Sequence, residues 1–472
     1  MITYVLKVKH LVPLLVFLFL PVLLFPDQPR TVPEEYAVRL GQMSEPLELH
    51  PAIEGALAFS GVSAARIPEY RDRILDYTRE LETAVSGIED DYEKGEAVLE
   101  FMHENILSVY SEYQTRVDVI LDRGTFNCVS SAVLYLIFMK SQGLNVQGVS
   151  TSSHAFCFIP IDGEIVDIET TNIHGFDPGR KQEFTDSFGN TTGYSYVPPG
   201  NYSLRTRLEE KQLIGLIFQN RIASLEARNR YAQTIGLAVD RYFLQQDQRS
   251  FEDMARTFIN YASVLNERGE YAAALEFLSE MQEEYGESSQ YNEIIGILTY
   301  NLAVELFNSR ELGEAQEVLS EGYETGTINE REYRELMTGI VETRIANQIN
   351  SLPFEEAMEV LNEAIALESI SQSRYREYMV YLYGNKSQRI AEEEGFLAAA
   401  RFLEEGLSLL GQSRQLRQAM EGYYHNYAVE IHNRFGELYN SGQTREARRV
   451  LEQGLENVPD SRILQQDLRQ IQ

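Results

Sequence analysis

The chain has 472 residues, which is too long for a single ordinary hydrophobic core, so two or more domains are expected. Its hydrophobic content of 43% excludes a disordered chain, and its net charge of −31 argues against nucleic-acid binding because an acidic surface repels phosphates. With only two cysteines and no phosphate-binding loop, HExxH motif or EF-hand loop, the sequence predicts no disulfide framework, no cofactor and no metal.

The N-terminal segment reads as an export signal. Lys7 and Lys9 precede an apolar run over residues 11–25, which is shorter than the roughly 20 residues of a bilayer-spanning helix. We therefore predict a signal peptide or membrane-anchoring signal over residues 1–26, followed by a linker over 27–45. The basic flank stays in the cytoplasm, so we expect the rest of the chain to be extracytoplasmic, either periplasmic or anchored to the inner membrane.

An α+β domain is expected over residues 46–205. Two helices are predicted between residues 68 and 107, and an almost wholly apolar run predicts a central buried helix from Cys128 to Gln142. Thr125 or Asn127 can cap this helix, which puts Cys128 in its first turn.

The position of Cys128 admits two interpretations. The free N–H groups of a helix N-terminus favour an anion, and a thiolate beside a histidine is a nucleophile. Alternatively, Cys128 simply packs, as most free cysteines do.

Three strands follow the central helix, over residues 146–151, 154–161 and 164–169. Alternation of side chains along a strand places His154 on the same face as two carboxylates of the third strand. A histidine that shares a face with a carboxylate, after a cysteine that begins a helix, is a candidate catalytic group.

The turn between the last two strands decides which carboxylate reaches His154. A two-residue turn at Asp162-Gly163 would leave Asp167 about 13 Å away along the strand. A four-residue turn that begins at Pro160 would bring Asp167 within reach as a diagonal neighbour, and Pro160 favours this turn because it cannot donate to the ladder. Glu169 would then lie directly opposite His154, which makes it a rival for the same role.

Cys157 has the opposite parity from His154 and is predicted to lie in the core. A disulfide between Cys128 and Cys157 is the alternative in an oxidising compartment, and it would abolish nucleophilic chemistry. Residues 172–202 are rich in glycine and proline and predict a long ordered loop, which either shapes the site or only ties two domains together.

Residues 206–472 are predicted to form a repeat array of about six units of about 42 residues. A motif of alanine followed four residues later by leucine recurs five times, with a spacing of 41, 42, 42 and 48 residues, so the last unit carries an insertion of two helical turns. Each unit reads as two amphipathic helices that must stack on their neighbours. The motifs begin at Ala274, Ala315, Ala357, Ala399 and Ala447.

These units resemble tetratricopeptide repeats, as in the run from Glu270 to Leu278, although that family usually has a period of 34 residues. The resemblance implies an all-α TPR-like solenoid that binds a protein or peptide partner. A purely structural spacer is the alternative.

The α+β domain resembles the transglutaminase-like superfamily, which places a central helix against a small antiparallel sheet in a papain-like arrangement. The match consists of Asn127-Cys128 at the start of an apolar helix, His154-Ala155-Phe156 and Asp167, in that order. The resemblance implies Cys128 as nucleophile, His154 as base and acid, and Asp167 as the orienting group. The stretch from Leu121 to Gly124 is similar to a branch of the superfamily that is thought to be non-catalytic.

Two classes of function follow. The first is an exported cysteine acyl-transfer protein, of the peptidase, amidase or crosslinking type, whose repeats select a partner. The second is a non-catalytic envelope scaffold that binds proteins through its repeats.

Overall fold

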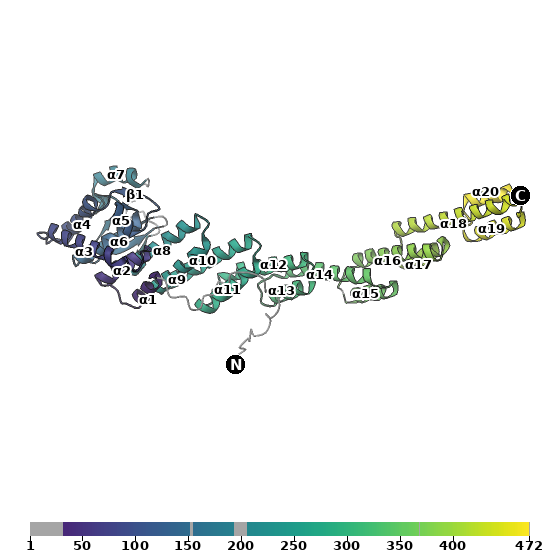
Figure 1. Ribbon diagram of the computed structural model, residues 1–472, viewed down its shortest axis with the longest axis horizontal. Helices are drawn as coiled ribbons and strands as arrows, with labels where there is room; N and C mark the ends of the chain where they lie inside the picture. The colour runs from purple at the N-terminus through teal and green to yellow at the C-terminus, as the bar shows by residue number, and fades with distance from the viewer. Residues whose placement is uncertain (1–31, 152–153, 193–204, 368, 472) are drawn as a thin grey trace, which may run out of the picture. The chain divides into compact units, whose positions relative to one another are not determined.

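The computed structural model describes residues 32–151, 154–192, 205–367 and 369–471. The predicted signal segment and the first part of the linker therefore lie outside the described residues. Contacts divide the chain into two compact units, Met1–Tyr261 and Ala262–Gln472, and each is described by itself. The chain is mostly helical with a small antiparallel sheet, as the prediction of an α+β part and a helical array requires at this coarse level (Figure 1).

The first unit is built around helix α6 (Cys128–Ser141), which confirms the predicted central helix. Every residue from Val129 to Met139 is buried, because the helix is covered on all sides. Its neighbours are α2 (Leu49–Phe59), α3 (Ile67–Ala84), α4 (Asp91–Asn105), α5 (Val117–Arg123), α8 (Glu210–Glu226) and strand β4 (Ala155–Ile161).

The sheet has four antiparallel strands in the order β5-β4-β3-β6. Helix α6 packs on β4 and α8 packs on β3, so the sheet lies against the helical core. A separate parallel pair, β1 and β2, precedes α6. The remaining strands are β1 (Val109–Tyr110), β2 (Thr125–Phe126), β3 (Gln147–Ser150), β5 (Glu164–Ile168) and β6 (Thr206–Leu208).

The turn between β4 and β5 corrects the predicted register. Asp162 and Gly163 both have positive φ, +50° and +83°, as in the tight two-residue turns that suit a hairpin. Asp167 consequently pairs with Phe158 and Pro160 pairs with Ile165. The four-residue turn was wrong because Pro160 lies beyond the part of β4 that pairs with β3, so its missing N–H removes no bond from that ladder.

Residues 172–202 contain helical structure where a loop was expected. Helix α7 (Gln182–Thr192) follows the short 3-10 helix η1 (Pro178–Arg180), and residues 193–204 lie outside the described part. The first unit is completed by α1 (Val32–Gly41), η3 (Tyr231–Thr234), α9 (Ile235–Gln245) and the first part of α10 (Gln248–Glu267). Strand β6 and helices α8 and α9, which the sequence assigns to the repeat array, are part of this unit.

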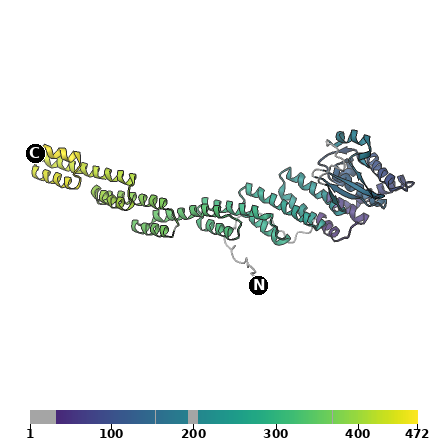
Figure 2. The same cartoon turned by 180° about the vertical axis from the view of Figure 1, so that it is seen from behind.

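The second unit consists of helix pairs in which successive helices lie side by side (Figures 1 and 2). The alanine and the leucine of each predicted motif are fully buried at 0% exposure, and both lie on the second helix of a pair. The helices are α11 (Tyr271–Tyr285), α12 (Tyr291–Asn308), α13 (Leu312–Glu324), α14 (Glu330–Ser351), α15 (Phe354–Ala366), α16 (Gln372–Glu393), α17 (Phe396–Leu410), α18 (Arg414–Asn440), α19 (Thr444–Asn457) and α20 (Arg462–Gln470).

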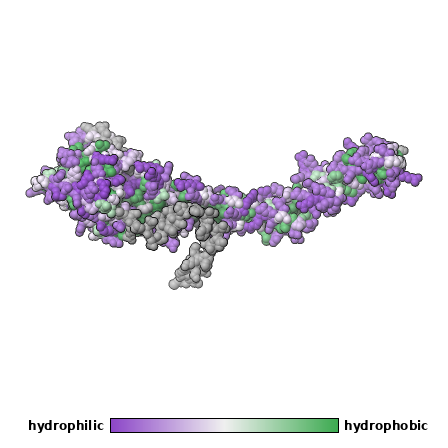
Figure 3. Space-filling view, in the orientation of Figure 1, coloured by the Kyte–Doolittle hydropathy of each residue, from purple (hydrophilic) through white to green (hydrophobic). Residues whose placement is uncertain are grey.

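The predicted insertion lengthens one helix. Helix α18 has 27 residues, against 22 in each of α14 and α16. Hydrophilic residues cover most of the visible face of these helices, as expected for an acidic chain (Figure 3). Within the described residues, no helix combines the length and the apolar character that a membrane span requires.

Candidate functional site

Local sequence places Cys128 at the first position of α6. Asn127 caps the helix: its side chain accepts from the Ser130 N–H at 2.9 Å, and the Ser130 hydroxyl accepts from the Asn127 N–H at 2.9 Å. This reciprocal cap at Asn127 fixes the start of the helix, so that Cys128 is its first residue. Cys128 is half-buried and lies where the unpaired N–H groups of the helix favour negative charge.

His154 precedes β4, and its ring contacts two aromatic rings. The Phe156 ring is stacked at 6.2 Å and the Phe188 ring of α7 meets it edge-on at 6.2 Å. The His154 side chain is only 12% exposed. Cys128 lies near enough to the imidazole to raise its pKa, so the structure brings the predicted nucleophile and the predicted base together.

The carboxylate beside His154 belongs to Glu169. Its Oε2 lies 2.6 Å from Nε2 of His154, and its Oε1 accepts from the Thr171 hydroxyl at 2.8 Å. In the observed register Glu169 follows β5 on the face of His154, two positions closer than Asp167. The carboxylate is therefore held at both oxygens, with one of them on the imidazole.

Asp167, the expected orienting group, is bound elsewhere. Its two oxygens accept from the Arg205 guanidinium at 2.9 and 2.6 Å. Arg205 also lies over the Phe156 ring, 5.0 Å from its centroid. The expectation that Asp167 orients His154 is thus corrected, because the two-residue turn carries Asp167 past the histidine and leaves the rival Glu169 in its place.

The charge state of His154 follows from these contacts. Burial by itself lowers the pKa of the imidazole, but the charge of Glu169 and the hydrogen bonds to Cys128 and Glu169 outweigh burial and raise the pKa well above its usual value. Because Glu169 occupies Nε2, Nδ1 is the ring nitrogen that can exchange a proton with Cys128.

Cys157 is a core residue, as its parity predicted. It is fully buried, its Sγ faces the carbonyl of Ala132 at 3.6 Å, and burial raises the pKa of its thiol. Both cysteines are free, so the alternative disulfide is absent and Cys128 keeps its thiol.

A hydrogen-bonded turn ties Glu169 to the central helix. The Thr170 hydroxyl lies 2.8 Å from that of Ser131 on α6, and the Thr170 carbonyl lies 3.1 Å from Nε2 of His103 on α4. Burial lowers the pKa of His103 to about 4, so this imidazole is neutral at pH 7 and donates to the carbonyl. Sequence reasoning missed these residues, since nothing local links α4 to the turn.

Helix α7 supplies a second missed group. Phe184 and Phe188 are buried and their rings pack together at 4.9 Å, and the Phe188 ring meets that of His154. Ser187 of the same helix accepts from the Asn172 side chain at 2.9 Å. The spacing of the two phenylalanines by four residues was the signal in the sequence for a helix with one apolar face.

Among the residues that the structure describes, no group of three or more His, Cys, Asp or Glu side chains is placed to hold a metal ion. Comparison with known protein families finds no family that matches the chain, and no curated protein matches it either.

Proposed function

We propose that the chain is a cysteine acyl-transfer enzyme of the peptidase, amidase or crosslinking type. The observation that carries the proposal is the half-buried Cys128 at a helix N-terminus, in contact with a histidine whose other nitrogen is held by Glu169. A nucleophile, a base and a group that orients the base are the parts that thiol catalysis needs.

The proposed reaction runs in two halves. The thiolate of Cys128 attacks the carbonyl carbon of an amide, and the oxyanion that forms accepts from the main-chain N–H of Cys128. Protonated His154 then gives its proton to the leaving amine as the C–N bond breaks, which leaves a thioester. Water or a second amine next loses a proton to His154 and attacks the thioester, which releases an acid or a new amide together with free Cys128.

Glu169 takes the orienting role in this proposal. Its charge stabilises the imidazolium, and its bond to Nε2 leaves Nδ1 as the nitrogen that would serve Cys128. The Thr171 hydroxyl keeps the carboxylate in place from the other oxygen.

The remaining parts of the proposal rest on architecture. A buried helix that starts with the cysteine and packs on an antiparallel sheet supports a transglutaminase-like domain. Helix pairs with a period of about 42 residues support a TPR-like array that binds a protein or peptide partner. The apolar N-terminal run supports an extracytoplasmic site, with or without a membrane anchor.

The rate of Cys128 alkylation by iodoacetamide from pH 5 to pH 9 tests the proposal. Wild-type Cys128 and a His154→Ala variant would be compared in a Cys157→Ala background, which removes the only other thiol. We expect fast alkylation of Cys128 at neutral pH that slows sharply in the variant. A slow thiol that is indifferent to His154 would refute the enzyme and leave a scaffold that acts through its repeats.

A further inference from the structure

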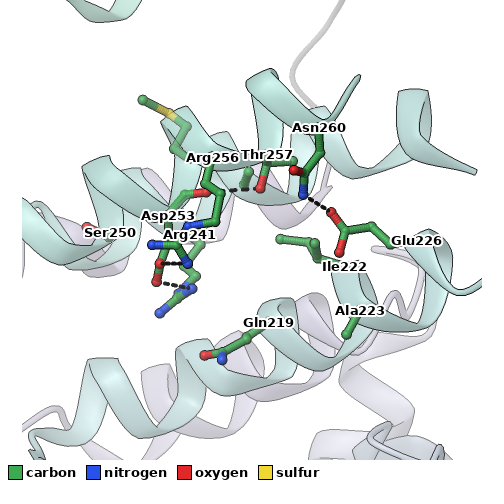
Figure 4. A pocket seen from close by; sticks show the side chains of 12 residues that line it. Gln219, Ile222, Ala223, Glu226, Arg241, Ser250, Asp253, Arg256, Thr257 and Asn260 are labelled. Atoms are coloured by element: carbon green, nitrogen blue, oxygen red, sulfur yellow. Dashed lines mark hydrogen bonds and ion pairs between the residues drawn. The ribbon is translucent and has the colours of Figure 1, made fainter. Parts of the chain in front are cut away.

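A cavity of about 200 Å³ lies between α8, α9 and α10, within the first unit. None of its lining residues belongs to the Cys128 site. Figure 4 shows Gln219 and Ala223 of α8 across the cavity from Arg256 and Asn260 of α10. Gln219 and Ala223 are exposed, so the cavity opens to solvent along α8.

Arg241 of α9 gives the cavity a buried cationic end. Its side chain is 7% exposed, and its Nη1 donates to Oδ2 of Asp253 at 2.9 Å. Its Nε is buried without a hydrogen-bond partner among the described residues. A buried N–H that lacks an acceptor is costly, so this end of the cavity favours a ligand with an oxygen acceptor.

At this end of the cavity two arginines share one carboxylate, while Glu226 brings the charge of the whole lining to neutrality. Asp253 serves two cations, because its other oxygen accepts from Arg256 at 3.1 Å. Glu226, the second carboxylate of the cavity, accepts from the side chain of Asn260 at 2.9 Å. Burial lowers the pKa of Arg241, with Asp253 partly opposing this effect, so a further negative charge would stabilise the charged guanidinium.

Part of the cavity wall is apolar. Ile222 and Ala223 of α8, Ala238 of α9 and Met254 of α10 contribute to it. An alkyl group against this wall would leave water while an attached acceptor meets Arg241.

We propose that the cavity binds an amphipathic carboxylate, with the carboxylate at Arg241 and its alkyl part on the apolar wall. A small monocarboxylic acid and the C-terminal carboxylate of a polypeptide share this chemistry. The proposal is independent of acyl transfer at Cys128, since the two sites have no residue in common.

Calorimetric titration of the full chain tests the site with three probes. Hexanoate and hexanol have the same alkyl chain and differ in charge, and an alternating Leu-Ala octapeptide with a free C-terminus represents a polypeptide. We expect hexanoate, the peptide or both to bind, and hexanol to bind at least roughly tenfold more weakly. Binding of hexanoate alone assigns the site to small acids, and binding of the peptide alone assigns it to polypeptide ends.

Two variants and a control complete the test. Arg241→Met should weaken binding of the carboxylate roughly tenfold or more, and Ala223→Phe should block the cavity while it leaves Arg241 in place. Arg228→Met removes an exposed arginine just after α8 and should leave the affinity unchanged. The proposal is overturned if neither carboxylate binds, if hexanol binds as well as hexanoate, or if folded Ala223→Phe binds like the wild type.

Discussion

Replacing Glu169 with glutamine removes the charge beside His154 and little else. The two side chains meet at 2.6 Å and are 12% and 4% exposed, so solvent screens the pair weakly. Two unit charges about 4 Å apart interact by about 4 kcal/mol at an effective dielectric constant of about 20. The amide of glutamine keeps a hydrogen bond to the ring, so we expect a loss of about 3 kcal/mol of imidazolium stabilisation.

This loss has a defined effect on Cys128. The pKa of His154 falls in Glu169→Gln, because the charge of Glu169 is the largest of the effects that raise this pKa against the lowering effect of burial. A smaller fraction of the molecules then holds the thiolate–imidazolium pair. The loss of about 3 kcal/mol of stabilisation of this pair slows alkylation at neutral pH roughly 100-fold. The assay is the iodoacetamide rate at pH 7, together with an NMR titration of the His154 ring.

Asp167→Asn is the matched control on the same strand. Its carboxylate serves Arg205, so this variant should lose the fork to that guanidinium and keep an alkylation rate close to that of the wild type. The reasoning fails if Asp167→Asn slows alkylation more than Glu169→Gln does. It also fails if the titration of His154 is the same in Glu169→Gln and in the wild type.

Three further predictions concern stability, each measured by urea denaturation. The pKa of His103 is lowered to about 4 from 6.5, so the folded state is most stable above pH 6.5, where this imidazole is neutral in both the folded and the unfolded chain. About 3 kcal/mol of the free energy of unfolding should be lost as the pH falls from 6.5 to 4, and the variant His103→Asn should not show this loss. A Cβ on Gly175 would lie 1.9 Å from a carbonyl oxygen in the turn beside the candidate site. Gly175→Ala should therefore lower the stability by about 2 kcal/mol or more and slow the alkylation of Cys128. Gly87 has open space around it, so Gly87→Ala should change neither. Leu361 is fully buried, so Leu361→Ala should destabilise the helical array by about 2–5 kcal/mol. Leu367 is 68% exposed, so Leu367→Ala should cost less than about 0.5 kcal/mol. Equal effects of the two variants would contradict the assigned core.

Local patterns predicted the parts of the fold that are themselves local. The apolar run after Asn127 predicted a central helix with Cys128 in its first turn. The recurring alanine and leucine predicted buried positions on the second helix of each pair. Both depend on side chains a few residues apart. The fork between Asp167 and Arg205 spans 38 residues, and no local pattern indicates it.

The choice between Asp167 and Glu169 shows why the site was harder to predict than its scaffold. A proline in a strand argues against pairing only on the side to which its missing N–H would point. On that side Pro160 has no partner, because β3 begins opposite Phe158. This could not be known before the neighbouring strand was placed. A tight turn at Asp162-Gly163 can be predicted without the neighbouring strand, because these two residues have the positive φ angles of such a turn whatever lies beside the hairpin. Where a local turn signal and a longer-range argument disagree over register, the local signal is the better guide, and in this chain it selects Glu169 as the partner of His154.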